Sequence, residues 1–327
     1  MVAWAERHCV LNEGQAGFRS GYSTADDVFV LQSLVQLRMA EPGQKLYCFY
    51  VDLRAAFDTI DWRALYWKMQ AAGLSTKLVR AVEAVYSNQW AAVFRDGAVS
   101  EWFGLSSGLR QGCLLSPFLF DLFINDLWEA MGGGVLVGGA KIKVLAFADT
   151  LVLIAPDPVS LQLMITDLNA YSTRWSLSIN LEKSKIMIFR NGGRRARAES
   201  WNLNGEPIEV VSKYKYLGVT LTPNLFYNEH FLERGQAVGV AVGKIWPMML
   251  RTGIPIGDKW RVFDATAKAV VQYGAQVWGY KKNALLERPQ LQFIRRLFTL
   301  PAHTPHYVLM LETNRPSMFL QMLPLQV

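Results

Sequence analysis

The stretch V-L-A-F-A-D-T-L-V-L-I, residues 144–154, is the part of the sequence around which the chain is organised. Two short runs of strand-forming apolar residues flank one acidic residue, Asp149. This pattern predicts a β-hairpin with buried arms and with Asp149 at or next to its turn. A carboxylate amid so much apolar surface must shift its pKa, find a cation or stay in contact with water. A solvated turn aspartate and a metal ligand are both open at this point.

A second carboxylate ends a second apolar run. The run L-Y-C-F-Y-V-D-L, residues 46–53, is continuously apolar up to Asp52, which predicts a strand buried on both faces. Helical patterns separate the two runs, so an α+β sheet can bring Asp52 and Asp149 together. Mg²⁺ prefers oxygen ligands and is usually held by one or two carboxylates plus substrate phosphates. In nucleotidyl transfer, a pair of such ions about 4 Å apart activates the attacking hydroxyl and stabilises the leaving oxygen.

Length and composition describe a folded protein with a polyanionic partner. The chain has 327 residues, of which 51% are hydrophobic, enough for about two domains. A net charge of +7 and a pI near 9.3 favour binding to phosphate backbones. Cys9, Cys48 and Cys113 are too few and too scattered for a disulfide framework or a zinc site, which indicates a reducing compartment.

The sequence has no membrane or export signal. No apolar run approaches the roughly 18 residues that a membrane span needs. The N-terminus carries Glu6 and Arg7 where a signal peptide would be apolar. We therefore expect an intracellular protein without membrane association.

The remaining elements follow from periodicity and turn residues. Helices are expected at 25–39, 62–72, 77–88, 117–130 and 160–175, strands at 185–189 and 214–221, a hairpin turn at 96–97, a flexible glycine connector at 132–139 and a basic loop at 191–197. Beyond residue 229 only helical spacing remains, as at 260–280 and 286–300. A separate helical domain is therefore expected to begin near 223–229.

Six short blocks occur in an order that is informative as a set. They are Q-A-G-F-R-S-G-Y-S-T at 15–24, F-Y-V-D-L-R-A-A-F-D at 49–58, G-L-R-Q-G-C-L-L-S-P-F-L-F at 108–120, F-A-D-T at 147–150, N-L-E-K-S-K at 180–185 and Y-L-G-V at 216–219. Together they resemble the reverse transcriptase region of non-LTR (LINE-type) retrotransposons, from about Glu13 to the C-terminus. The resemblance implies an α+β right-hand polymerase with partial fingers at 1–45, a fingers and palm core with an antiparallel palm sheet at 46–224, and a helical thumb at 225–327.

The resemblance also implies a reaction and a metal site. The reaction is RNA-directed DNA synthesis, in which deoxynucleotides are added to a primer 3′-hydroxyl by two-metal nucleotidyl transfer. Asp52 and Asp149 would be the catalytic metal-binding aspartates, with the backbone carbonyl of Leu53 beside the metal. The cofactor would be two Mg²⁺ ions, with Mn²⁺ as a substitute. The partners would be an RNA template, a DNA primer and a deoxynucleoside triphosphate, and the location nuclear if the protein acts at chromosomal DNA.

Four further residues are implied at the incoming nucleotide. Phe57 stands where the family has its aromatic steric gate, a ring that leaves no volume for a 2′-hydroxyl, and a core aromatic is the compatible alternative. Gln111 lies in a glycine-flanked loop before a helix, and Arg110 beside it is the weaker candidate. Arg19 either pairs with the triphosphate, because a guanidinium fork suits phosphate oxygens, or forms a structural salt bridge.

Basic residues elsewhere are implied to follow the nucleic-acid backbone. Lys183 and Lys185 resemble the palm-edge lysine motif, with no preference between them. In the thumb, the residues that could track a template-primer backbone, with simple solvation as the alternative, are Lys244, Lys259, Arg261, Lys268, Arg295 and Arg296.

The chain departs from the family at the hairpin tip, where the second of two consecutive aspartates is replaced by Thr150. A hydroxyl is a weaker cation ligand than a carboxylate, and the lost attraction is on the order of several kcal/mol. Three interpretations stay open, namely an impaired polymerase, a catalytically inactive nucleic-acid-binding relic and a pseudogene product without selected activity. We also expect a fragment or decayed copy, because the more N-terminal fingers block, an endonuclease domain and a Cys/His knuckle are missing.

Overall fold

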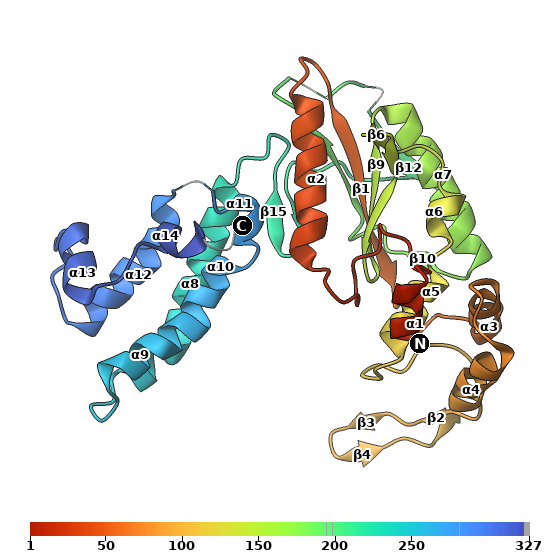
Figure 1. The fold of residues 1–327 in the computed structure, drawn as a ribbon, viewed down its shortest axis with the longest axis horizontal. Coiled ribbons are helices and arrows are strands. Elements are labelled where there is room, and N and C mark those ends of the chain that lie inside the picture. Colours follow the sequence, from red (N-terminus) through yellow and green to blue (C-terminus); the bar gives the residue numbers. More distant parts are fainter. Residues whose placement is uncertain (194, 198, 281, 324–327) are drawn as a thin grey trace. The chain divides into compact units, whose positions relative to one another are not determined.

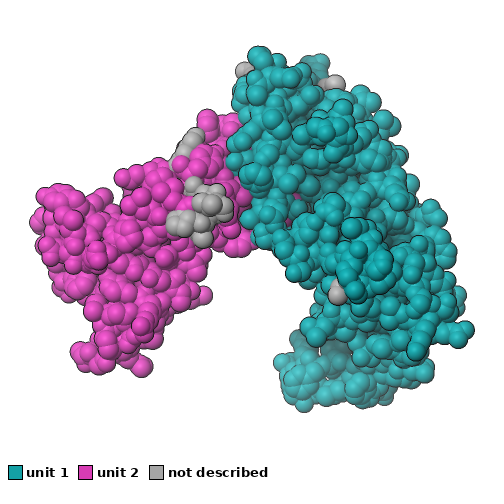
Figure 2. Space-filling view, in the orientation of Figure 1, with its two compact units in different colours: residues 1–212 teal, residues 213–327 magenta. Residues whose placement is uncertain are grey.

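The structure is a computed structural model that describes residues 1–193, 195–197, 199–280 and 282–323 (Figure 1). The chain divides into two compact units, Met1–Ser212 and Lys213–Val327 (Figure 2). The division precedes the segment 214–221, so this segment groups with the helices that follow it and not with the sheet of the first unit.

The first unit is built on a five-stranded antiparallel sheet with β1 (Leu46–Arg54) at its centre. One edge of β1 pairs with β9 (Thr150–Ala155), which in turn pairs with β8 (Val144–Phe147). The other edge pairs with β10 (Ser178–Ile179) and β11 (Lys185–Phe189). Nearly every position of β1 is buried, as a continuous apolar run requires. The predicted strand 46–53, hairpin 144–154 and strand 185–189 are confirmed.

Helices cover both faces of this sheet. α2 (Thr24–Met39) packs on β1 and β8, whereas α7 (Pro158–Arg174) packs on β1 and β9. Figure 1 shows the two helices on opposite sides of the sheet. The carboxylate of Asp157 caps α7 by accepting a hydrogen bond from the Ser160 amide at 2.8 Å. The predicted helices at 25–39 and 160–175 are confirmed.

The segment between β1 and β8 is mainly helical. A short helix, α1 (Val2–Arg7), precedes α2 at the start of the chain. The helices of this segment are α3 (Trp62–Ala71), α4 (Thr76–Tyr86), α5 (Ser116–Phe123) and α6 (Leu127–Ala130). The predicted single helix at 117–130 is wrong, because the chain turns between α5 and α6. The amide of Asn125 in this turn donates to the Val10 carbonyl and accepts from the Asn12 amide, both at 2.8 Å, so long-range contacts stabilise the break.

Hairpins occupy the remaining loops of the first unit. One carries β2 (Trp90–Ala91), β3 (Phe94–Arg95), β4 (Ala98–Val99) and β5 (Phe103–Gly104), and its predicted turn at Asp96-Gly97 is confirmed. The others pair β6 (Val135–Val137) with β7 (Ala140–Ile142) and β12 (Asn202–Leu203) with β13 (Glu206–Pro207). The predicted flexible connector at 132–139 is therefore wrong, because Gly138 and Gly139 adopt positive φ and form a hairpin turn. In the basic loop 191–197, Arg194 lies outside the described residues.

The second unit begins with a hairpin and continues with helices. β14 (Tyr214–Tyr216) pairs with β15 (Val219–Leu221), so the predicted single strand at 214–221 is wrong. Leu217 and Gly218 between them have φ of 43° and 82°, and a glycine inside a strand pattern often marks such a reversal. The helices are α8 (Asn228–Met249), α9 (Ile256–Phe263), a π-helical turn (Asp264–Lys268), α10 (Ala269–Gln272), α11 (Ala275–Trp278), α12 (Ala284–Leu297), α13 (His306–Thr313) and α14 (Met318–Met322).

The helical unit packs around aromatic side chains. α8 packs on α12, and Trp246, Phe263 and Phe293 form ring contacts in its core. The predicted helical spacing at 286–300 is confirmed in α12. The spacing at 260–280 does not give one helix, because a π-helical turn and Gly274, with a φ of 69°, interrupt it. None of the described helices is long and apolar enough to cross a lipid bilayer.

Candidate active site

Asp52 and Asp149 lie at the same end of the central sheet. Asp52, near the end of β1, is paired in register with Thr150, the first residue of β9. Asp149 immediately precedes Thr150 in the turn of the β8–β9 hairpin. Residues directly opposite each other in antiparallel strands point to the same face, with Cβ atoms about 4.5–5.5 Å apart. Asp52 and Thr150 therefore share a face, and Asp149 adjoins them at the tip.

The two carboxyl groups interact electrostatically. Burial raises the pKa of Asp149, the negative charge of Asp52 raises it further, and the charge of Lys183 opposes this rise. The Oδ2 atom of Asp52 accepts a hydrogen bond from the Asn180 amide at 3.3 Å and lies 3.7 Å from the Lys183 ammonium. A cation between the carboxylates would favour the charged form of both.

The donor set fits a hard divalent cation. Two mutually repelling carboxylates lie close together, Asp52 on β1 and Asp149 in the adjoining hairpin turn, and oxygen ligands of this kind suit Mg²⁺ or Mn²⁺. Leu53, whose carbonyl is the predicted third donor, is buried and paired with Ile179 of β10. Within the described ranges, no group of three or more His, Cys, Asp or Glu side chains is arranged to hold a metal ion. Backbone, water and substrate oxygens would complete the coordination of a cation at Asp52 and Asp149.

The N-L-E-K-S-K block at 180–185 supports Asp52. The Ser184 hydroxyl accepts a hydrogen bond from the Asp52 amide at 3.0 Å, and the Asn180 amide donates to the Asp52 carbonyl at 2.8 Å. The structure separates the two lysines of this block. Lys183 lies beside Asp52, whereas the Lys185 ammonium forms an ion pair with Glu209 at 2.7 Å. The roles of Asn180 and Ser184 were not predicted, although both lie in a block that the sequence singles out.

A cavity of about 520 Å³ collects three of the predicted nucleotide-binding residues. Its lining residues are Phe18, Phe57, Arg110, Gln111, Gly112, Cys113, Leu114, Ser116 and Pro117. The Phe57 ring stacks on Phe120 with centroids 4.7 Å apart, and Phe18 meets Phe57 edge-on at 6.3 Å. Phe57 is thus both a packed aromatic and a wall of the cavity.

The polar residues of this cavity have partners in the neighbouring loops. The Gln111 amide donates to the Asp58 carboxylate at 3.3 Å, and the Arg110 guanidinium donates to the Val85 carbonyl at 3.5 Å. Both side chains belong to exposed residues, so a ligand in the cavity can reach them.

Arg19 lies away from this cavity. Its side chain is 5% exposed and pairs with Glu6 at 3.4 Å and Glu13 at 3.5 Å. Its guanidinium also donates to the carbonyls of Asn12 and Gln15, each at 3.1 Å. These contacts correspond to the structural salt bridge that the sequence left open. The neighbouring Phe18, which lines the cavity, was not predicted.

The predicted basic residues of the second unit are partly engaged within that unit. Arg261 pairs with Asp258 at 3.1 Å, and Arg295 donates to the Thr304 carbonyl at 3.0 Å. The guanidinium of Arg296 lies 3.9 Å from the centroid of the Trp246 ring. Lys244 is exposed, and Lys259 and Lys268 are half-buried.

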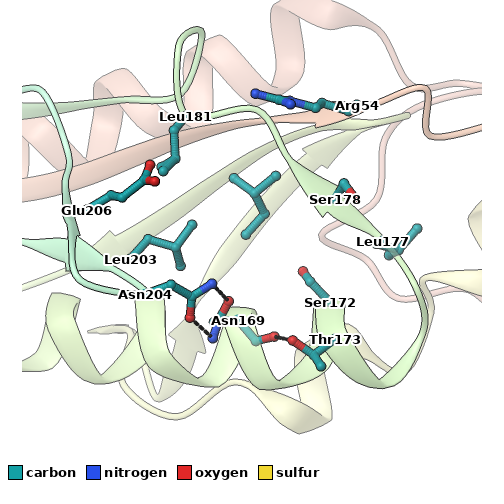
Figure 3. A pocket seen from close by; sticks show the side chains of 11 residues that line it. Arg54, Asn169, Ser172, Thr173, Leu177, Ser178, Leu181, Leu203, Asn204 and Glu206 are labelled. Carbon is teal, nitrogen blue, oxygen red and sulfur yellow. Dashed lines mark hydrogen bonds between the residues drawn. The ribbon is translucent and has the colours of Figure 1, made fainter.

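A second cavity, of about 380 Å³, is polar but contains none of the predicted site residues. It lies against α7 and β10 and is lined by Arg54, Asn169, Ser172, Thr173, Leu177, Ser178, Ile179, Leu181, Leu203, Asn204 and Glu206 (Figure 3). Asn169 and Asn204 exchange two amide hydrogen bonds, at 2.7 and 3.0 Å, as Figure 3 shows. The side-chain amides of Asn169 and Asn204 thus satisfy each other.

Relatives of known type match most of the chain. The polymerase of the mobile element jockey from Drosophila funebris is 23% identical over 300 residues, which cover 88% of this chain and 32% of that protein. The Pol polyprotein of the retrotransposable element R2 from Popillia japonica is 24% identical and covers 86% of this chain and 47% of that protein. The chain thus spans about a third to a half of the length of these relatives.

A solved structure and a family model agree with these relatives. The telomerase of Candida albicans, solved with a fragment of telomeric RNA, matches 95% of this chain and 57% of that chain with a TM-score of 0.52 at 9% identity, which supports the polymerase fold. The family model described as reverse transcriptase (RNA-dependent DNA polymerase) matches residues 3–221. The chain belongs to the reverse transcriptase family, and within it resembles the RNA-directed DNA polymerases of non-LTR (LINE-type) retrotransposons.

Proposed function

We propose that this chain is the polymerase region of a non-LTR retrotransposon protein, which extends a DNA primer on an RNA template at a rate reduced by Thr150. The observation that carries the proposal is the register of β1 and β9, which sets Asp52 opposite Thr150 and next to Asp149. The aromatic cavity with Phe57 and Gln111 supports it.

The proposed chemistry is transfer of a nucleotidyl group. The primer 3′-oxygen forms a bond to the α-phosphorus of the deoxynucleoside triphosphate while the bond from that phosphorus to the bridging oxygen of the β-phosphate breaks. Pyrophosphate leaves, and the hydroxyl proton passes to solvent. Two divalent ions, when bound, make the hydroxyl more acidic and stabilise the charge of the leaving oxygen.

Each protein group has a positional role in this proposal. Asp52 and Asp149 hold the ions. Phe57, whose ring is fixed against Phe120, lies under the sugar and excludes a 2′-hydroxyl. Gln111 lines the nucleotide cavity, and Lys183 stands beside Asp52 where it can meet a phosphate.

Thr150 is the reason for the reduced rate. Its side chain shares a face with Asp52, so an aspartate there would add a third carboxylate close to the ions. A unit charge at about 4 Å contributes about 4 kcal/mol at an effective dielectric constant of about 20. Because about 1.4 kcal/mol corresponds to tenfold in rate, the natural residue can cost up to about 10³-fold.

Primer extension tests the proposal. The natural chain, Thr150→Asp and Asp52→Ala are compared on an RNA template with Mg²⁺ and with Mn²⁺, and circular dichroism confirms folding of each. We expect slow extension by the natural chain, faster extension by Thr150→Asp and none by Asp52→Ala. If Thr150→Asp is as inactive as a folded Asp52→Ala, the polymerase proposal fails.

A nucleic-acid-binding relic is the second candidate. It is favoured by the net charge of +7 together with Thr150 at the tip. It predicts binding of an RNA/DNA duplex whose affinity falls linearly with salt on a logarithmic scale, without extension by any variant. Absence of binding at low salt removes this candidate.

A further inference from the structure

Part of the Q-A-G-F-R block, residues 15–19, lies along the edge of β8 that does not pair with β9. The proposed metal site gives this block no role. The Ala146 amide donates to the Gly14 carbonyl at 2.7 Å, and the Ala16 amide donates to the Ala146 carbonyl at 2.8 Å. Gln15 thereby forms a parallel bridge with Ala146. The block extends the sheet at the hairpin that carries Asp149.

The side chain of Gln15 holds the tip of this hairpin from inside the protein. Gln15 is 1% exposed. Its Oε1 atom accepts hydrogen bonds from the amides of Ala148 at 3.1 Å and Gly17 at 2.8 Å. Its Nε2 atom donates to the Ala148 carbonyl at 3.4 Å. One amide group thus contacts both the N–H and the C=O of Ala148.

Ala148 needs such support because its backbone is in the left-handed region. Its φ is 56°, a conformation that costs an L-residue roughly 1–2 kcal/mol. The Ala148 carbonyl belongs to the peptide group that joins this residue to Asp149. Fixing that carbonyl therefore fixes the plane from which the Asp149 side chain departs.

The approach of the block to the tip depends on Gly17. A Cβ atom at this position would lie 2.2 Å from the Ala148 nitrogen and 3.0 Å from the Gln15 Oε1 atom. These distances leave no room for a side chain. The contact between the block and the tip is thus a backbone approach that the amide of Gln15 bridges.

We propose that Gln15 is a positioning residue that fixes the Ala148–Asp149 peptide group and so aims the Asp149 carboxylate at the divalent cation. The inference rests on the proposed function and deepens it. Gln15 does not touch the cation or the nucleotide, and it acts through the backbone of Ala148. Residues that orient metal ligands in this way typically contribute roughly 10-fold to 100-fold in metal affinity.

The test measures Mn²⁺ affinity on the full chain without any reaction. Free Mn²⁺ is titrated by electron paramagnetic resonance for the natural chain, Gln15→Met, Asp52→Asn and Asp149→Asn. Met has a similar length and no hydrogen-bonding amide. We expect Gln15→Met to weaken Mn²⁺ binding by roughly 10-fold to 100-fold and each aspartate variant to weaken it at least as much.

A second readout needs no metal. In protein labelled with ¹⁵N-alanine, the Ala148 amide signal is assigned by its absence in Ala148→Gly. Its hydrogen exchange should be faster in Gln15→Met by roughly fivefold, because one hydrogen bond contributes about 1 kcal/mol. Gln290→Met is the matched control, since Gln290 is a fully buried glutamine that donates to the Pro316 carbonyl at 3.0 Å in the second unit. It should lower stability and leave both readouts unchanged.

The outcomes separate the inference from the proposed function. If Gln15→Met lowers the melting temperature but keeps natural Mn²⁺ affinity and natural Ala148 exchange, while the aspartate variants lose affinity, the inference is overturned and the metal site stands. If Asp52→Asn and Asp149→Asn both bind Mn²⁺ as the natural chain does, the proposed site fails, and the inference fails with it. Weaker binding in all three variants together with faster Ala148 exchange supports both.

Discussion

The β3–β4 and β8–β9 hairpins of the first unit both turn over two residues, yet they are stabilised differently. In the first, Asp96 and Gly97 have φ of 51° and 83°, and the flanking strands are exposed. An Asp-Gly pair adopts this turn by itself. In the second, Ala148 takes a positive φ without a glycine, inside a buried hairpin.

The difference shows where local strain is tolerated. A turn made by its own residues needs no neighbours and can protrude into solvent. A turn that contains a strained alanine forms only where surrounding groups over-determine it, and such positions cluster at functional sites. In the β8–β9 turn, the hydrogen bonds of the Gln15 amide and the close approach of Gly17 hold Ala148 in its strained conformation. The unfavourable tip is therefore the one that carries Asp149, the proposed metal ligand.

The largest difference between the two hairpins should appear when the aspartate in each turn is replaced by asparagine. In a Thr150→Asp background, Asp149→Asn should lower primer extension by on the order of 10³-fold, because it removes about 4 kcal/mol of attraction to the cations. Asp96→Asn should leave extension unchanged, since its side chain is 90% exposed in the other turn. Single-turnover extension rates measure both. Equal effects at the two tips would contradict the distinction drawn between them.

A pH-dependent effect on stability should come from Asp121 on α5, a residue that is 1% exposed. Burial raises its carboxyl pKa to about 8, although the charge of Arg19, from the same block as Gln15, opposes the rise. The unfolded carboxyl loses its proton near pH 4 and the folded one near pH 8, so the folded state binds more protons in this window and loses stability as the pH rises.

Asp121→Asn should remove this pH-dependent loss. The variant should match the natural chain near pH 4, and its excess in free energy of unfolding should grow by about 1.4 kcal/mol for each pH unit as the pH rises toward 8. Urea unfolding at several pH values measures the difference. A stability difference that does not change with pH would show that the Asp121 carboxyl ionises normally in the fold.

A coupling of about 1 kcal/mol should link Gln15 to Ala148. Glycine adopts positive φ without strain, so Gln15→Met should destabilise an Ala148→Gly protein less than it destabilises the natural one. A double-mutant cycle in urea measures this coupling. Gly97→Ala changes the turn of the exposed β3–β4 hairpin, so its effect on the free energy of unfolding should add to that of Gln15→Met. Coupling between these two substitutions would mean that the effect of Gln15 is not specific to the buried turn.

The smallest effect should come from the exposed hairpin itself. Phe94 and Trp102 are 72% and 67% exposed, so Phe94→Ser and Trp102→Ser should change the free energy of unfolding by less than about 0.5 kcal/mol. Thermal and urea unfolding measure this. A loss of primer extension at unchanged stability would assign this hairpin a functional role as well.

Patterns that local chemistry decides were predictable from the sequence. The buried strand with Asp52 and the hairpin with Asp149 follow from apolar continuity, and the Asp96-Gly97 turn follows from residue type. The single strand expected at 214–221 failed because Leu217 and Gly218 reverse the chain. Apolar continuity alone does not distinguish one long strand from two short ones.

Contacts between distant segments were not predictable. The break after α5 is stabilised by the Asn125 side chain, which donates to the Val10 carbonyl and accepts from the Asn12 amide, both far away in the sequence. The same applies to Gln15, whose partner Ala148 is specified only by the folded sheet. For Arg19 a structural salt bridge was one expected alternative, but the sequence did not identify Glu6 and Glu13 as its partners. The sequence blocks identified the segments that form the site, but not the hydrogen-bond and ion-pair partners of each residue.

Gly17 cannot be replaced by another residue without disturbing the turn that carries Asp149. A side chain there would collide with the Ala148 nitrogen, so a missense change at this codon displaces the tip while both aspartate codons remain intact. Counting intact aspartates would therefore overestimate how many related sequences still encode the proposed metal site. Screening these sequences for glycine at this position would correct the estimate.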